Sequence, residues 1–90
     1  MKLAEILYCD GRRNFIKPKN GKKFSLNELQ KIVGGLIEFV RAKDGRTMVI
    51  NEEGKLINLP INYYASKLYI NNKCDFILGD VLITDYDLIS

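Results

Sequence analysis

The segment FSLNELQKIVGG, residues 24–35, constrains the fold more than any other stretch of the sequence. Ser25 can cap the start of a helix, and Glu28 can reach back to the amide of the cap, which completes a capping box. Phe24 and Leu29 have the spacing of a hydrophobic staple, and the apolar residues after the cap share one face at helical periodicity. Gly34 supplies the left-handed conformation that ends a helix. The sequence therefore predicts an amphipathic helix between Ser25 and Gly34.

Short β-rich runs separated by turn residues make up most of the remaining chain. Glycine accepts the positive φ of a tight turn, so Asp10-Gly11 and Asp44-Gly45 are expected to turn two hairpins. Leu36–Ala42 has apolar residues on both faces, as a central strand does. The β-rich runs are, in chain order, Leu3–Tyr8, Arg13–Lys17, Leu36–Ala42, Arg46–Ile50, Lys55–Ile57, Phe76–Leu78 and Val81–Thr84.

A second helix is expected from Tyr63 to about Tyr69, with Asn62 as its cap. Helical spacing places Tyr64 on the side of the core and leaves Tyr63 more exposed. The chain is long enough for one core and shows no linker or repeat, so we expect a single domain over residues 1–90. The predicted fold is α+β, with a small, mostly antiparallel sheet of five or six strands and two short helices.

The absence of histidine from all 90 residues is the main constraint on chemistry. Histidine is the commonest general base, the commonest metal ligand and the usual partner of a nucleophilic Cys or Ser. Cys9 and Cys74 lack C-x-x-C spacing, which is typical of small buried side chains. We therefore expect a protein that is not an enzyme and that uses no cofactor or metal.

Neither a membrane span nor a signal peptide is indicated. No apolar run approaches the roughly 18 residues that a spanning helix requires. Glu5 interrupts the apolar residues of the N-terminus, and no small-residue cleavage site follows. We expect a cytoplasmic protein that does not contact the membrane.

Positive charge is concentrated between residues 12 and 23, a stretch without any acidic residue. Its four lysines precede the amphipathic helix, whose free amides and positive dipole end also favour anions. A phosphate-bearing ligand, a nucleic-acid backbone or another acidic partner would be attracted there, and the alternative is a solvated loop that keeps the protein soluble. The candidate residues are Lys17, Lys19, Lys22 and Lys23.

A second candidate surface lies on the predicted helix after Pro60. Tyr63 and Lys67 are four residues apart on one side of this helix, where an aromatic face and an ammonium group can converge on a ligand. The alternative is that this helix and the turn before it serve only to cover the hydrophobic core.

Three segments of the chain resemble one known family. FSLNELQKIVGGLIEFV, DGRTMVINEEGKLINLPINYYASKLY and FILGDVLIT are similar to the small phage- and plasmid-encoded proteins that contain the domain of unknown function DUF3846. The resemblance covers about residues 22–84 and excludes the N-terminal hairpin. It implies a bacterial host cell and an accessory role in a phage or mobile element, and it supplies no reaction, cofactor or catalytic residue.

Three kinds of function fit these observations. The first is a counter-defence inhibitor that binds a host defence protein through its sheet edge or charged faces. The second is a sponge that sequesters an anionic nucleotide signal, as a homo-oligomer with pockets between protomers that are lined by the basic loop and the second helix. The third is a nucleic-acid-binding protein, although the chain has no recognised reading motif.

Overall fold

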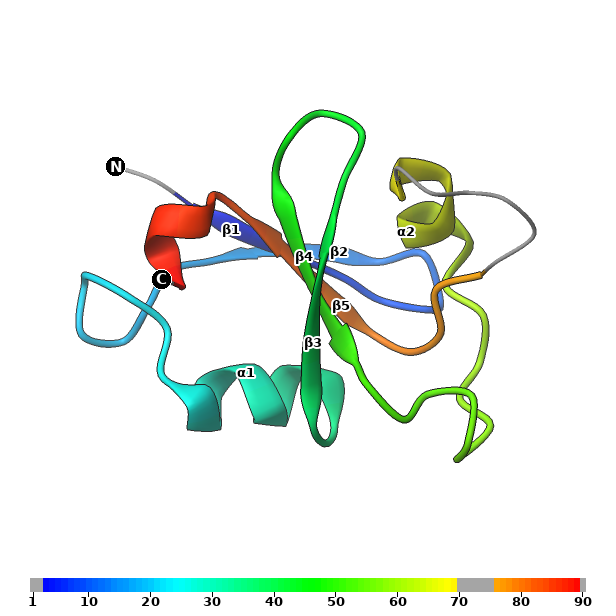
Figure 1. The fold of residues 1–90 in the computed structure, drawn as a ribbon. Coiled ribbons are helices and arrows are strands. Elements are labelled where there is room, and N and C mark those ends of the chain that lie inside the picture. The colour runs from blue at the N-terminus through cyan, green and yellow to red at the C-terminus, as the bar shows by residue number, and fades with distance from the viewer. Residues whose placement is uncertain (1–2, 70–75, 90) are drawn as a thin grey trace.

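The computed structural model describes residues 3–69 and 76–89 of the chain. Its strands are β1 (Ala4–Leu7), β2 (Arg13–Ile16), β3 (Ile37–Arg41), β4 (Thr47–Asn51) and β5 (Val81–Thr84). Its helices are α1 (Leu26–Val33), α2 (Tyr63–Leu68) and the short 3-10 helix η1 (Tyr86–Leu88). All strand pairs are antiparallel, and the strand order is β2-β1-β5-β4-β3 (Figure 1). The predicted α+β fold is confirmed.

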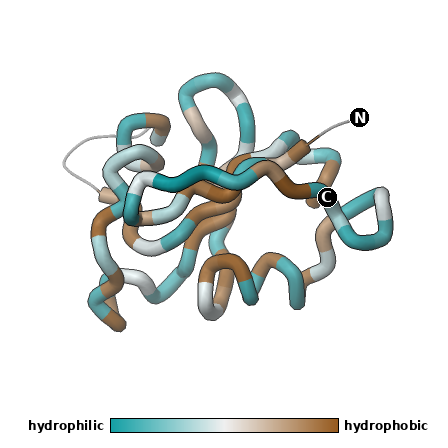
Figure 2. The backbone as a smooth tube through the Cα atoms, turned by 180° about the vertical axis from the view of Figure 1, so that it is seen from behind, coloured by the Kyte–Doolittle hydropathy of each residue, from teal (hydrophilic) through white to brown (hydrophobic). Residues whose placement is uncertain are grey.

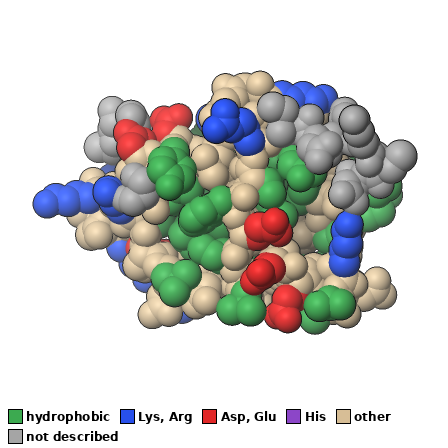
Figure 3. Space-filling view, in the orientation of Figure 1, with side chains coloured by type: hydrophobic (Ala, Val, Ile, Leu, Met, Phe, Trp, Pro, Cys, Tyr) green, Lys and Arg blue, Asp and Glu red, His purple; other side chains and the backbone are tan. Residues whose placement is uncertain are grey.

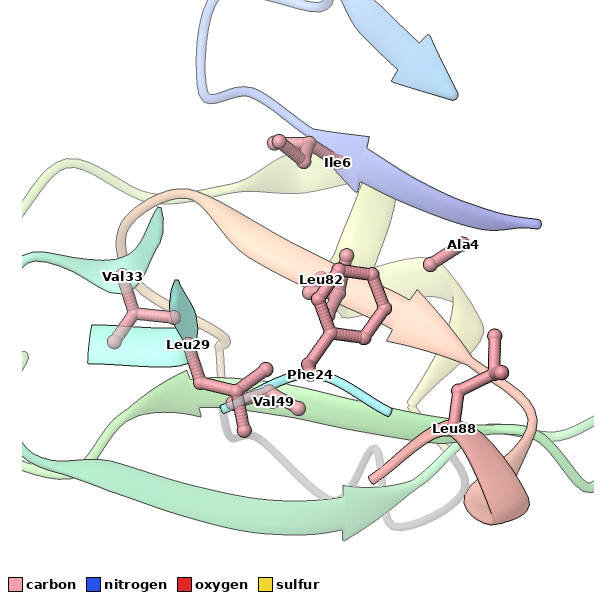
Figure 4. Packing of buried hydrophobic residues seen from close by; sticks show 8 residues of the cluster. All are labelled: Ala4, Ile6, Phe24, Leu29, Val33, Val49, Leu82 and Leu88. Atoms are coloured by element: carbon pink, nitrogen blue, oxygen red, sulfur yellow. The ribbon is translucent and has the colours of Figure 1, made fainter. Parts of the chain in front are cut away.

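Alternation along the strands divides the core between the two faces of the sheet. On one face Val49 and Leu82 pack against Leu29 and Phe24, which come from α1 and the residue before its cap (Figure 4). On the other face a second apolar cluster includes Ala65 of α2. Successive residues of a strand point to opposite faces, so the buried strands β1 and β5 supply side chains to both clusters. Figure 2 shows these hydrophobic strands in the middle of the fold and hydrophilic loops around them.

The local signals of α1 are confirmed. The Ser25 side chain accepts a hydrogen bond from the amide of Glu28 at 3.1 Å, and the Glu28 carboxylate accepts one from the amide of Ser25 at 2.9 Å. Gly34 ends the helix with φ of 83°. Every partner in these contacts lies within a few residues, which is why the sequence alone predicts them.

The prediction that Leu36–Ala42 forms a central strand is wrong. β3 lies at an edge of the sheet, and the centre is occupied by the fully buried β5. Helix α1 is only eight residues long and covers β3 only in part, so Phe39 remains 45% exposed. Apolar residues on both faces of a strand therefore do not establish a central position here.

Two predicted strands and one core residue also differ from the structure. Residues 52–58 form consecutive turns, in which Asn58 takes a positive φ of 59° and Leu56 is 82% exposed, so Lys55–Ile57 is not a strand. Phe76–Leu78 is reduced to a single bridge between Leu78 and Ile61. Tyr64 is 38% exposed and lies outside the core, because α2 has only six residues and turns Ala65 toward the sheet.

Asn62 joins three parts of the fold. Its side-chain oxygen caps α2 by accepting a hydrogen bond from the amide of Ala65 at 3.0 Å, as predicted. Its side-chain nitrogen donates to the carbonyl oxygens of Leu7 at 2.8 Å and Gly79 at 3.0 Å. Asn62 is only 1% exposed, so this amide links α2, β1 and the turn before β5 inside the core.

Candidate partner-binding surface

Residues 17–23, which we call the basic loop, connect β2 to α1 and hold four exposed lysines on a fixed backbone. The side chain of Asn20 accepts hydrogen bonds from the amides of Lys22 and Lys23 at 2.8 and 3.0 Å. The amide of Lys19 donates to the Glu28 carboxylate at 3.1 Å, and Pro18 is buried beneath the loop. Figure 3 shows Lys and Arg side chains that project at this end of the molecule. The loop therefore displays its positive charge through side chains, while several of its amides are bonded internally.

The start of α1 already contains a negative charge. The Glu28 carboxylate accepts hydrogen bonds from the amides of Ser25 and Lys19, and these contacts lower the pKa of Glu28 from its ordinary value of 4.5. A carboxylate in this place uses the positive end of the helix dipole that an external anion would otherwise use. An anion that approaches the basic loop is therefore met by lysine side chains rather than by a cradle of free amides.

Replacing Glu28 with glutamine is expected to lower the free energy of unfolding at pH 7 by about 0.5–1 kcal/mol, because the charged cap is lost. The pKa of Glu28 is lowered in the folded state, so its contribution is present above the unfolded pKa and is lost as the pH falls through the folded value. Urea denaturation of both proteins between pH 7 and pH 3 measures this effect. The difference in free energy of unfolding between the two proteins should decrease as the pH falls. A difference that is constant with pH would contradict the role assigned to Glu28.

The strand β2 forms an open edge of the sheet beside the basic loop. The amide of Tyr8 donates to the carbonyl of Arg12 at 3.0 Å, and in this antiparallel register the next bonded pair is Ile6 with Asn14. The backbone N–H and C=O groups of Arg13 and Phe15 consequently point away from β1, toward solvent. The Phe15 side chain is 61% exposed. An extended segment of another chain can pair with these groups.

The side chain of Arg13 is fixed on one face of this edge. It forms an ion pair with Glu5, whose side chain is only 5% exposed, and its guanidinium lies 5.2 Å from the centre of the Tyr64 ring. Both contacts anchor Arg13 to β1 and α2. Phe15 and Lys17, further along the edge, remain exposed for an external partner.

The two groups of predicted site residues do not come together. The basic loop lies at one end of the molecule and α2, with Tyr63 and Lys67, at the other end, and the two opposite views agree on this (Figures 1 and 2). Tyr63 is exposed, as predicted, and its ring makes an edge contact with Phe76 at 6.5 Å between ring centres. A small ligand on a single protomer cannot contact both groups.

The sequence interpretation missed the open edge of β2 and its aromatic residue. The signal was present in the alternation of Arg13, Phe15 and Lys17, but strand order decides which strands are edges, and that order depends on distant pairings. Within residues 3–69 and 76–89, no group of three or more Cys, Asp or Glu side chains is arranged to hold a metal ion. In the same described ranges, no helix has both the length and the apolar character that crossing a membrane requires.

Comparison with known proteins gives one result. The sequence model of the family described as "Domain of unknown function (DUF3846)" matches residues 5–88. The match includes β2 and all of β1 except Ala4, so it extends beyond the resemblance over residues 22–84 into the N-terminal hairpin. No curated protein and no solved structure matches the chain significantly.

Proposed function

Since the chain belongs to the DUF3846 family, we propose that it is a non-catalytic accessory protein of a phage or mobile element, which inhibits a host defence protein by binding it. The phage setting and the counter-defence role rest on the family resemblance. The binding mode rests on the surface formed by β2 and the basic loop.

The proposed contact is strand addition at the open edge of β2. The outward N–H and C=O groups of Arg13 and Phe15 supply main-chain hydrogen bonds to an extended segment of the host protein. This open edge leads directly into the basic loop, and that continuity is the single observation that carries the proposal. A segment that pairs with β2 and continues along the chain direction meets Lys17 and Lys19, so the partner is expected to carry acidic side chains there.

The two alternative functions require different features of this surface. A sponge for an anionic nucleotide needs pockets between protomers, because a single protomer separates the basic loop from Tyr63 and Lys67. A nucleic-acid backbone needs the lysines but not the strand edge, and its binding falls steeply with salt. A protein partner needs both the lysines and the edge.

Charge reversal in the basic loop tests the proposal. The tagged protein is used to capture partners from nuclease-treated host cells, and the affinity for the purified partner is then measured. Lys17→Glu with Lys19→Glu is expected to weaken binding at least tenfold, since acidic side chains of the partner would then meet two carboxylates. Lys31→Glu with Lys43→Glu makes the same change of charge on α1 and after β3, and should leave the affinity within twofold.

Three outcomes would count against this function. The proposal fails if both double variants weaken binding equally, because charge in general would then explain the effect. It also fails if the only molecules retained are nucleotides recovered intact after heat release, which is the result expected of a sponge. Binding only to nucleic acid, with loss at higher salt, would replace it by the third alternative.

A further inference from the structure

Asn20 is followed by glycine, unlike any other asparagine in the sequence. Both residues are exposed and lie in the basic loop, which projects from the molecule between β2 and α1 (Figure 1). Because glycine has no Cβ, its amide nitrogen can approach the side-chain carbon of the preceding residue closely. The side chain of Asn20 can therefore close a five-membered ring onto the backbone and lose its amide group.

The loop holds the side-chain oxygen of Asn20 between two backbone donors. The amides of Lys22 and Lys23 donate to Oδ1 at 2.8 and 3.0 Å. Attack on the side-chain carbon moves negative charge onto this oxygen, and fixed donors at such distances stabilise the charge as an oxyanion hole does. Both donors already point at Oδ1 in the folded loop, so the reaction requires no rearrangement on this side.

The attacking atom is the amide nitrogen of Gly21, which must first lose its proton to the solvent. This amide donates to the carbonyl of Pro18 at 3.0 Å, and that bond has to open. Opening of a single bond in an exposed turn costs far less free energy than unfolding the sheet. The positive charge of the four lysines in the loop favours the deprotonated nitrogen.

We propose that Asn20 is a site of spontaneous deamidation, which the basic loop promotes and which lowers the positive charge of the partner-binding surface. The nitrogen of Gly21 forms a bond to the side-chain carbon of Asn20. The bond from that carbon to Nδ2 breaks, and ammonia leaves with the proton that Gly21 has lost. Water is the only other reactant, and it opens the cyclic imide at either carbonyl to give aspartate or isoaspartate.

Both products put a carboxylate among the lysines of the loop. An aspartate fits this turn, since the carboxylates of Asp10 and Asp44 accept hydrogen bonds from the amides two residues later at 2.9 and 3.0 Å. Isoaspartate lengthens the backbone by one carbon, so it disturbs the contacts with Lys22 and Lys23 as well. Either product attracts an acidic partner segment less strongly. This consequence for binding rests on the proposed function.

The rate of deamidation in the folded protein tests the site. The protein and a synthetic peptide of residues 17–24 are kept at the same neutral pH and temperature, and mass spectrometry of proteolytic fragments follows Asn20. Since the peptide has no fixed donors, conversion should be roughly threefold faster or more in the folded protein. The exposed Asn27 and Asn58, which precede larger residues, should convert at least tenfold more slowly than Asn20. Conversion no faster than in the peptide, or equal conversion of the three asparagines, would overturn the site.

The consequence for binding is measured with Asn20→Asp, which reproduces the aspartate product in every molecule. It should weaken binding of the captured partner roughly threefold or more at low salt, and less at high salt because ions screen the added charge. Asn58→Asp makes the same change at an exposed position outside the basic loop and should leave the affinity within twofold. Equal affinities of the two variants would overturn the consequence for binding. A failure to capture any protein partner would instead refute the proposed function, whereas the conversion of Asn20 is measured without a partner.

Discussion

Replacing Asn62 with aspartate is expected to cost about 3–5 kcal/mol of folding free energy, the largest stability effect of any single change considered. The side-chain nitrogen donates to the carbonyls of Leu7 and Gly79, and aspartate replaces that donor with a second carboxylate oxygen. A buried charge would then face two carbonyl oxygens that have lost their donor, and each uncompensated polar group costs about 1–3 kcal/mol, more when it is charged. A domain of this size has a total stability of roughly 5–15 kcal/mol, so the variant should be close to unfolding.

Urea denaturation followed by circular dichroism measures this loss. Asn58→Asp is the matched control, because it makes the same chemical change at an exposed position four residues earlier. It should change the free energy of unfolding by at most about 0.5 kcal/mol. Lowering the pH should recover part of the Asn62→Asp loss, since a protonated carboxyl can donate to one of the two carbonyls. Equal effects of the two variants would show that Asn62 does not join the three segments as described.

The second large effect is expected for binding rather than for stability. Replacing Phe15 with proline should weaken binding of the partner at least tenfold while the protein stays folded. The amide of Phe15 points away from β1, so proline removes no bond of the sheet, and edge strands accept proline at such positions. The substitution removes the donor and the exposed ring that the proposed contact uses. Phe15→Thr, which keeps the amide, should therefore lose less affinity than Phe15→Pro.

The neighbouring position provides the complementary control. The amide of Asn14 points toward β1, where Asn14 pairs with Ile6. Asn14→Pro should therefore destabilise the sheet by about 1–3 kcal/mol, because a ladder bond is lost and its acceptor is left without a partner, whereas Phe15→Pro should not. Thermal denaturation separates the two variants. If both proline variants unfolded at the same temperature, the assigned register of β1 and β2 would be wrong.

The parts of the fold that sequence could predict are those whose causes are local. The box of Ser25 and Glu28, the end of α1 at Gly34 and the cap at Asn62 each depend on residues within four positions. The two hairpin turns are local in the same way, and the strands that they join are confirmed as neighbours.

The predictions that failed concern features that depend on pairing between segments distant in the sequence. β3 looked central because both faces contain apolar residues, but β5, from the far end of the chain, takes the central place between β1 and β4. The same insertion leaves β2 and β3 as edges. The two donor contacts of Asn62 cannot be read from the sequence, because they join segments that are distant in the chain.

The separation of the predicted site residues also follows from topology. Lys17, Lys19, Lys22 and Lys23 lie together because they are close in the sequence, and so do Tyr63 and Lys67. Whether the two groups meet depends on where α2 lies over the sheet, and it lies at the end far from the basic loop.

Backbone amide hydrogen exchange in the complex with the captured partner tests the central claim most directly. The amides of Arg13 and Phe15 have no strand on their outer side among the residues that the structure describes, so they should exchange rapidly in the free protein and become at least tenfold slower in the complex. The amide of Asn14 serves as an internal reference, since β1 already protects it. A complex that forms while Arg13 and Phe15 exchange as fast as before would contradict strand addition at β2.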